Sequence, residues 1–163
     1  MKRVLVLLAL LCLALFSPAS AGGGSGALRR PAPNFTLTDL GGERVSLADL
    51  RGEAVIVQFG DLGCGVCREN DRLLRQYQFE YLSHGLVVVS LYGQATLGEV
   101  QRYDAEFTFS TLTGLDPGQA IARQYQALPI PTTVFIDRDG FIRDVHRGRL
   151  SEEELLRWLQ RFL

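Results

Sequence analysis

Basic residues other than arginine are almost absent from this sequence. Lys2 is its only lysine, and the 17 lysine and arginine residues are balanced by 18 aspartate and glutamate residues, for a formal net charge of −1. No segment collects basic residues into the clustered face that binds nucleic acid. We therefore expect no nucleic-acid partner.

Cysteine and histidine are also scarce, with 3 of the first and 2 of the second. Zinc-finger spacing is absent, because Cys64 and Cys67 are followed neither by a second cysteine pair nor by suitably spaced histidines. We expect His84 and His146 to be ordinary surface or core side chains, and we predict no metal site. Two thiolates alone can hold Cu(I), which leaves a copper-binding chaperone open as an alternative.

The sequence has one long apolar run, Val4–Phe16, and it is shorter than the roughly 20 residues of a membrane-spanning helix. Lys2 and Arg3 precede this run, and Ala19-Ser20-Ala21 follows it as a cleavage motif. These features predict a secretory signal peptide over residues 1–21 and an exported protein, periplasmic or otherwise extracytoplasmic. An uncleaved signal that serves as a membrane anchor is the alternative.

The rest of the chain divides into a short linker and one domain. Residues 22–30 are rich in glycine, which predicts a flexible linker, and residues 31–163 suffice for one domain with a full core. Export places the cysteines where disulfides persist. Because a bridge across two residues constrains very little of the chain, we expect the Cys64–Cys67 pair to carry out chemistry instead of stapling the fold.

Strand and helix patterns alternate along the domain. Alternating or buried apolar runs predict strands over Asn34–Leu40, Ala54–Phe59, Leu86–Leu91, a short segment near Thr111, Thr132–Ile136 and Phe141–His146. Helical spacing predicts a turn at Ser46–Gly52 and helices over about 64–84, 96–103 and 118–127, and a capping box predicts one from Ser151. This order predicts an α/β fold with helices on both faces of an open sheet.

Four stretches carry a family resemblance: "APNFTLTDLGGERVSLADLRG", "VIVQFGDLGCGVC", "YQALPIPTTVFIDRDG" and the capped final helix. Together they resemble the exported TlpA/ResA-like group of the thioredoxin-fold superfamily, and the resemblance runs from about Ala32 to Leu163. The resemblance implies a thioredoxin-like fold: a central mixed β-sheet flanked by helices, with an N-terminal β extension. It also implies a thiol-disulfide oxidoreductase, with no cofactor beyond a redox-active Cys64–Cys67 disulfide.

The resemblance gives the two cysteines different roles. Cys64 follows a buried strand and opens a helix, where free amide donors and the helix dipole stabilise a thiolate. It is expected to be the nucleophile that attacks a substrate disulfide. Cys67, one turn later, is expected to be the resolving thiol that releases the resulting mixed disulfide.

The resemblance also implies a substrate-binding surface around the cysteines. Pro131 matches the family's cis-proline, so the Ile130–Pro131 bond is expected to be cis and the backbone of Ile130 to pair with the substrate chain. Gly65 and Val66, between the cysteines, are expected to contact the substrate as well. Pro129 is a rival cis site, although it lies outside the Pro-Thr-Thr match.

Several positions depart from the family pattern. Gly63 stands where the family usually has tryptophan, Gln58 replaces the buried aspartate of thioredoxin, and Asn70 replaces a glutamate of several relatives. Both familiar acid/base positions therefore lack a carboxylate. Asp61 and Glu69 are the candidate replacements, although on a helix Glu69 points about 100° away from Asn70. For Asp61, a solvated loop side chain is the favoured alternative.

Partners follow from the same resemblance. We expect the protein to reduce disulfides in exported proteins such as apocytochrome c or copper-site proteins, and to exchange electrons with a membrane thiol-disulfide partner. We also expect it to act as a monomer. A disulfide-donating oxidant and a non-catalytic binding module remain alternatives. Peroxidase activity is disfavoured, because "FGDLGC" lacks the threonine and proline that peroxiredoxins place before their reactive cysteine.

Overall fold

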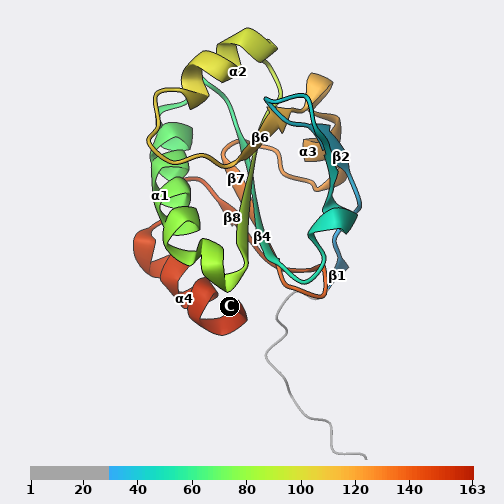
Figure 1. Cartoon of the computed structure of the whole chain (residues 1–163), viewed down its shortest axis with the longest axis vertical. Helices are drawn as coiled ribbons and strands as arrows, with labels where there is room; N and C mark the ends of the chain where they lie inside the picture. Colours follow the sequence, from blue (N-terminus) through green and yellow to red (C-terminus); the bar gives the residue numbers. More distant parts are fainter. Residues whose placement is uncertain (1–29) are drawn as a thin grey trace, which may run out of the picture.

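A six-stranded mixed sheet runs through the centre of the domain, in the order β1-β8-β7-β4-β5-β6 (Figure 1). The computed structural model describes residues 30–163. The predicted signal peptide and the linker as far as residue 29 lie outside the described residues. Within the described part of the chain, no helix has the length and apolar character needed to cross a membrane.

The elements alternate along the chain much as the sequence predicts. The strands are β1 (Arg30–Pro31), β2 (Thr36–Thr38), β3 (Arg44–Ser46), β4 (Ala54–Gly60), β5 (Leu86–Tyr92), β6 (Leu112–Leu115), β7 (Thr132–Ile136) and β8 (Phe141–Arg147). The α-helices are α1 (Gly65–Tyr81), α2 (Leu97–Asp104), α3 (Ala120–Gln124) and α4 (Glu152–Phe162). Short 3-10 turns lie at Leu47–Leu50, Leu82–His84 and Pro117–Gln119.

Helices cover both faces of the sheet, as expected. On one face, α1 and α4 pack Leu74 and Trp158 against sheet residues such as Ile56. On the other face, the β2–β3 hairpin and α3 contribute to a second core that includes Phe59 and Tyr125. A third, smaller cluster forms around Tyr92, Val100 and Tyr103, beneath α2.

The sheet register brings the chain segments of the CxxC region together. β4 runs parallel to β5, with Gly60 opposite Tyr92, and antiparallel to β7, with Phe59 opposite Thr132. The carboxyl ends of β4 and β5 therefore meet the start of β7 at one edge. Sites in α/β sheets form at such carboxyl ends, and this is where the chain passes from β4 into Cys64.

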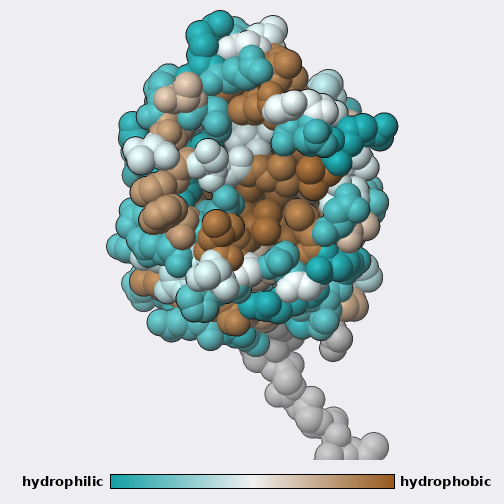
Figure 2. Space-filling model, in the orientation of Figure 1, coloured by the Kyte–Doolittle hydropathy of each residue, from teal (hydrophilic) through white to brown (hydrophobic). Residues whose placement is uncertain are grey.

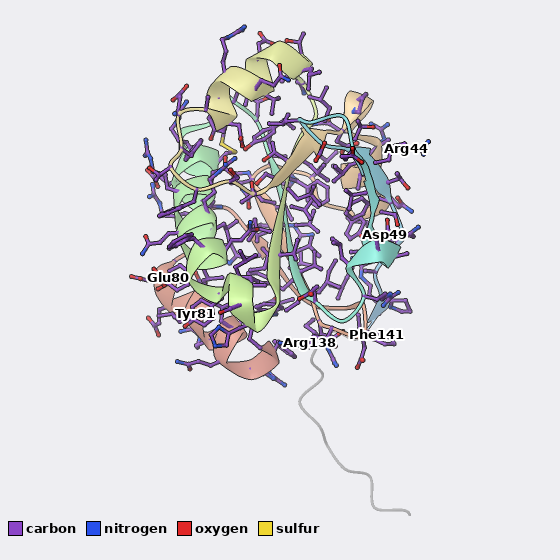
Figure 3. The ribbon with its side chains drawn as sticks, viewed as in Figure 1. Arg44, Asp49, Glu80, Tyr81, Arg138 and Phe141 are labelled. Atoms are coloured by element: carbon purple, nitrogen blue, oxygen red, sulfur yellow. A yellow bond between two sulfur atoms is a disulfide. The ribbon has the colours of Figure 1, made fainter. Side chains whose placement is uncertain are left out.

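The other end of the domain is closed by polar contacts. Arg138, which Figure 3 labels at this end, lies in the β7–β8 turn. It donates from Nη2 to the carbonyl oxygen of His84 at 2.8 Å, and from Nη1 to that of Gly52 at 3.2 Å. The turn has Gly140 at φ 79°, as its predicted tight turn requires.

Much of the face in Figure 2 is polar, with an apolar hollow near its middle, over the sheet edge at β6.

Three local predictions need correction. Arg30, assigned to the linker, pairs with Ile142 and belongs to β1. The extended segment after Gly42 forms an additional strand, β3, which pairs with β2. The helix predicted over 118–127 is shorter, because Gly118 and Gln119 have φ of 64° and 59°, outside the helical region.

Candidate active site

The backbone before α1 places the two cysteines. The Asp61 side chain accepts a hydrogen bond from the Gly63 amide at 2.9 Å, and the Asp61 carbonyl accepts one from the Cys64 amide at 3.2 Å. Cys64 is the N-cap of α1, and its Sγ accepts a hydrogen bond from the Cys67 amide at 3.1 Å. The N-terminus of α1 thus directs an amide donor at the sulfur of Cys64, which favours its thiolate.

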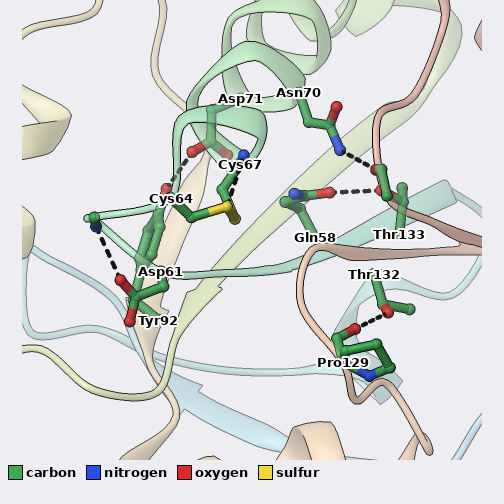
Figure 4. The surroundings of a disulfide bond; sticks show 12 residues. Gln58, Asp61, Cys64, Cys67, Asn70, Asp71, Tyr92, Pro129, Thr132 and Thr133 are labelled. Atoms are coloured by element: carbon green, nitrogen blue, oxygen red, sulfur yellow. Dashed lines mark hydrogen bonds between the residues drawn. A yellow bond between two sulfur atoms is a disulfide. The ribbon is translucent and has the colours of Figure 1, made fainter.

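Cys64 and Cys67 form a disulfide, with 5.2 Å between their Cα atoms (Figure 4). The two sulfurs differ in access. Cys67 is fully buried at 0% exposure, whereas Cys64 is partly exposed. Of the pair, only Cys64 therefore presents surface to a macromolecular partner.

The proline loop lies at the start of β7. Both the Ile130–Pro131 and the Leu128–Pro129 peptide bonds are cis, so the prediction for Pro131 is confirmed and the rival site adopts the same geometry. Pro131 is buried and Ile130 is partly exposed. Between the cysteines, Gly65 is exposed and Val66 is partly exposed, in the first turn of α1. Contact of Ile130, Gly65 and Val66 with a substrate stays a prediction.

The candidate carboxylates are engaged elsewhere. Asp61 holds the turn through the Gly63 amide. Glu69 is exposed, and its carboxylate forms an ion pair with Arg149, in the loop before α4. The structure thus places Asp61 in the loop next to Cys64 and directs Glu69 toward the loop of Arg149.

The two amides at the familiar acid/base positions make structural hydrogen bonds. Asn70 donates from Nδ2 to the Gly148 carbonyl at 3.0 Å and accepts at Oδ1 from the Leu150 amide at 2.9 Å. Gln58, fully buried on β4, accepts at Oε1 from the Thr133 hydroxyl at 2.6 Å. Neutral amides do not exchange protons near neutral pH, so these side chains fix the loop before α4 and the β4–β7 pair.

We expect Asn70→Ala to destabilise the domain by about 1–3 kcal/mol, because the Leu150 amide and the Gly148 carbonyl would both lose a buried partner. Disulfide exchange should persist, since Asn70 holds no proton for the cysteines. Urea denaturation and an exchange assay check the two parts. Gln76→Ala is the matched control on an exposed face of α1 and should change stability by less than about 0.5 kcal/mol. Loss of exchange in a folded Asn70→Ala protein would contradict this assignment.

A buried carboxyl group that the sequence analysis missed lies one helical turn after Cys67. Asp71 is 1% exposed, and its Oδ2 accepts hydrogen bonds from the hydroxyls of Tyr92 at 2.9 Å and Tyr103 at 2.7 Å. Burial raises the pKa of Asp71, although both phenols oppose this shift. The four-residue spacing from Cys67 was the available signal, since residues i and i+4 share a helix face.

The two histidines are not part of this site. His84 lies in the 3-10 turn at the far end of α1 from Cys64. His146, on β8, is 2.7 Å from the Arg149 carbonyl through Nε2. Among residues 30–163, no three or more histidine, cysteine, aspartate or glutamate side chains are grouped as metal ligands would be.

Sequence comparison places these features in a family. A family model described as the AhpC/TSA family matches residues 28–145, more than half of the chain. The chain belongs to the AhpC/TSA family. Its fold is the thioredoxin-like fold, which agrees with the predicted mixed sheet and its N-terminal β extension.

Individual relatives carry more specific names. The thiol-disulfide oxidoreductase ResA of Bacillus thuringiensis is 26% identical over 132 residues, which cover 81% of this chain and 76% of ResA. The thioredoxin-like protein YneN of Bacillus subtilis is 32% identical and covers 76% of this chain and 74% of YneN. A crystal structure of a thiol:disulfide interchange protein of Chlorobium tepidum superimposes with TM-score 0.75 at 25% identity, covering 85% of this chain and 99% of that one. These findings confirm the expected class, a thiol-disulfide oxidoreductase that acts on protein thiols and disulfides.

Proposed function

We propose that this thiol-disulfide oxidoreductase is exported and reduces disulfides in other exported proteins, apocytochrome c and copper-site proteins being the substrates that its family resemblance favours. The observation that carries the proposal is the unequal access of the two sulfurs. Cys64 caps a helix and is partly exposed, whereas Cys67 is fully buried one turn later. This arrangement suits the Cys64 sulfur for attack on a substrate disulfide and the buried Cys67 sulfur for resolution of the mixed disulfide.

The cycle begins with both cysteines reduced. The Cys64 thiolate attacks a substrate disulfide, so that a mixed disulfide forms and one substrate thiolate leaves. Cys67 then attacks Cys64 Sγ, which forms the Cys64–Cys67 disulfide and releases the second substrate thiol. The substrate gains two electrons and the cysteine pair loses two. The pair itself is the redox group, and no further cofactor takes part in these steps.

Re-reduction requires an electron donor. In an exported protein, the natural source is a membrane thiol-disulfide partner that carries electrons from the cytoplasm, and we propose such a donor here. The partly exposed sulfur of Cys64 suits this step, in which a thiolate of the donor attacks Cys64 Sγ and Cys67 leaves as a thiolate. A second donor thiol then attacks the mixed disulfide and releases reduced Cys64, so that the donor ends as a disulfide. The protein is proposed to act as a monomer, with one Cys64–Cys67 pair per chain.

The reduction potential of the Cys64–Cys67 couple tests the direction of electron flow. We expect a value close to that of thioredoxin, about −270 mV, after equilibration of residues 22–163 with dithiothreitol or glutathione buffers. A value near about −120 mV would instead identify an oxidant that donates its disulfide. If no buffer changes the redox state of the pair, the exchange function itself is wrong and a binding module takes its place.

A further inference from the structure

The Asp71 carboxyl group is buried with one oxygen unused. Its Oδ2 accepts the two phenolic hydrogen bonds, whereas its buried Oδ1 has no hydrogen-bond partner among the described residues. A buried polar atom without a partner is costly and calls for an explanation at a functional site. Two phenols from different elements, β5 and α2, hold this carboxyl group in place.

The carboxyl group lies one helical turn from the resolving cysteine. Asp71 follows Cys67 by four residues on α1, so the two side chains share a helix face. Tyr92 and Cys67 both pack near Gly60, where a Cβ atom would lie 3.6 Å from Tyr92 Cε1 and 3.7 Å from Cys67 Sγ. In Figure 4, Asp71 and Tyr92 lie on the side of the disulfide opposite to Gln58 and Thr133.

The resolving step needs a proton acceptor at this place. A thiol must become a thiolate before it attacks, and buried thiols resist ionisation. Gln58 and Asn70 are amides with no proton to exchange, and the carboxylate of Glu69 pairs with Arg149. Asp71 is the carboxyl group that the fold buries on the same face of α1 as Cys67.

We propose that Asp71 accepts the Cys67 proton during resolution, while Tyr92 and Tyr103 hold its carboxylate in position. This inference rests on the proposed function. The Cys67 S–H bond breaks and its proton moves to Asp71, directly or through one water molecule. Cys67 Sγ then bonds to Cys64 Sγ, and the substrate sulfur leaves with the electron pair of the broken mixed disulfide. Asp71 afterwards returns the proton to solvent.

The charges around Asp71 suit this role. Burial raises the pKa of Asp71, and the hydrogen bonds from Tyr103 and Tyr92 lower it in part. Arg75 and Arg68, on the same helix, also lower it, while their own ion pairs run to Asp104 and Glu106. The net effect is a raised pKa, which makes the carboxylate a stronger base than an exposed aspartate and better matched to proton transfer near neutral pH.

The test separates the two half-reactions. The reduced protein is mixed with an equimolar amount of the disulfide of thionitrobenzoate, whose coloured thiolate is released once when Cys64 attacks and again when Cys67 resolves. We expect Asp71→Asn to leave the first release unchanged and to slow the second by about 10²-fold at pH 7. Absence of the first release in the wild type would refute the proposed function, independently of Asp71.

The pH dependence adds a readout that a structural role would not give. In the wild type, the second release should accelerate as pH rises through the Asp71 pKa and then level off. This inflection should be missing in Asp71→Asn, and the two rates should converge at alkaline pH, where Cys67 ionises unaided. Tyr92→Phe removes one hydrogen bond to the carboxylate, so it should shift the inflection to higher pH without abolishing it.

The pH dependence of folding stability provides a control that does not rely on disulfide exchange. Because the folded-state pKa of Asp71 is raised, its contribution to stability is present at acid pH and is lost as pH rises through that pKa. Asp71→Asn should therefore gain stability relative to wild type toward neutral pH.

An unchanged second release in Asp71→Asn, or equal slowing of both releases, would overturn the proposal. If Asp71→Asn does not fold, an unshifted inflection in Tyr92→Phe would overturn it.

Discussion

A Cys64→Ser variant is expected to lose disulfide exchange to below detection, although it keeps the second thiol. The reason is access: Cys67 is 0% exposed, so its sulfur cannot approach the disulfide of a folded or extended partner. A serine hydroxyl at position 64 cannot form a disulfide in its place. Reduction of insulin disulfides, with dithiothreitol as the electron source, measures this loss against the wild-type protein.

The matched variant is Cys67→Ala, which keeps the nucleophile and removes the resolving thiol. It should complete the first half-reaction and accumulate mixed disulfides through Cys64, which non-reducing electrophoresis and mass spectrometry would identify. Under the same oxidising challenge, Cys64→Ser should trap none. Turnover in Cys64→Ser, or alkylation of Cys67 faster than Cys64 in the reduced native protein, would reverse the assigned roles.

The CxxC region was predictable because its signals are local. A buried β-branched run predicts β4, helical spacing predicts α1, and the junction between them places Cys64 at a helix N-terminus. The final helix was predictable for the same reason, since Ser151 and Glu154 form the expected capping box. In each case the residues that decide the structure lie within a few positions of one another.

Elements that carry no periodic signal of their own were missed. β1 and β3 have 2 and 3 residues, too few to show a period, and they are strands because they pair with β8 and β2. The start of α3 is set by Asp116, whose two carboxylate oxygens each accept an amide hydrogen bond at 2.8 Å, from Ile121 and Ala122. Between Asp116 and the helix lie Gly118 and Gln119, two residues with positive φ, which helical periodicity does not reveal.

Long-range packing limited the prediction of the acid/base groups. Glu69 was a candidate because it lies near the cysteines in sequence, but its partner Arg149 comes from a loop 80 positions later. Asp71 lies one helical turn from Cys67, and this spacing alone could have identified it as a candidate acid/base group. Its burial, however, depends on Tyr92 and Tyr103, which arrive from β5 and α2. Burial by long-range packing decides which carboxyl group can serve, and sequence spacing does not report it.

Asp104→Ala is expected to be the most destabilising of the substitutions considered, at about 3–5 kcal/mol, because it would leave a buried arginine without its counter-charge. The side chain of Arg75 is 1% exposed, and its Nη2 donates to Asp104 Oδ1 at 2.7 Å. Its Nη1 donates to the Phe109 carbonyl at 3.1 Å, and the guanidinium lies 4.3 Å from the centre of the Phe107 ring. Urea denaturation, with the slope checked for a change in denatured-state compactness, measures the loss.

The control is an arginine–carboxylate ion pair that is exposed to solvent. On α4, Arg157 Nη1 lies 2.5 Å from Glu153 Oε1, and the two side chains are 59% and 84% exposed. Glu153→Ala should therefore lower the free energy of unfolding by only about 0.3–0.5 kcal/mol. The ratio between the two losses measures what burial adds to an arginine–carboxylate pair in this domain. If Asp104→Ala cost no more than Glu153→Ala, then the Phe109 carbonyl and the Phe107 ring would suffice to hold Arg75, and the ion pair would contribute nothing of its own. A large difference would instead show that the end of α2, next to Tyr103, is fixed by charge.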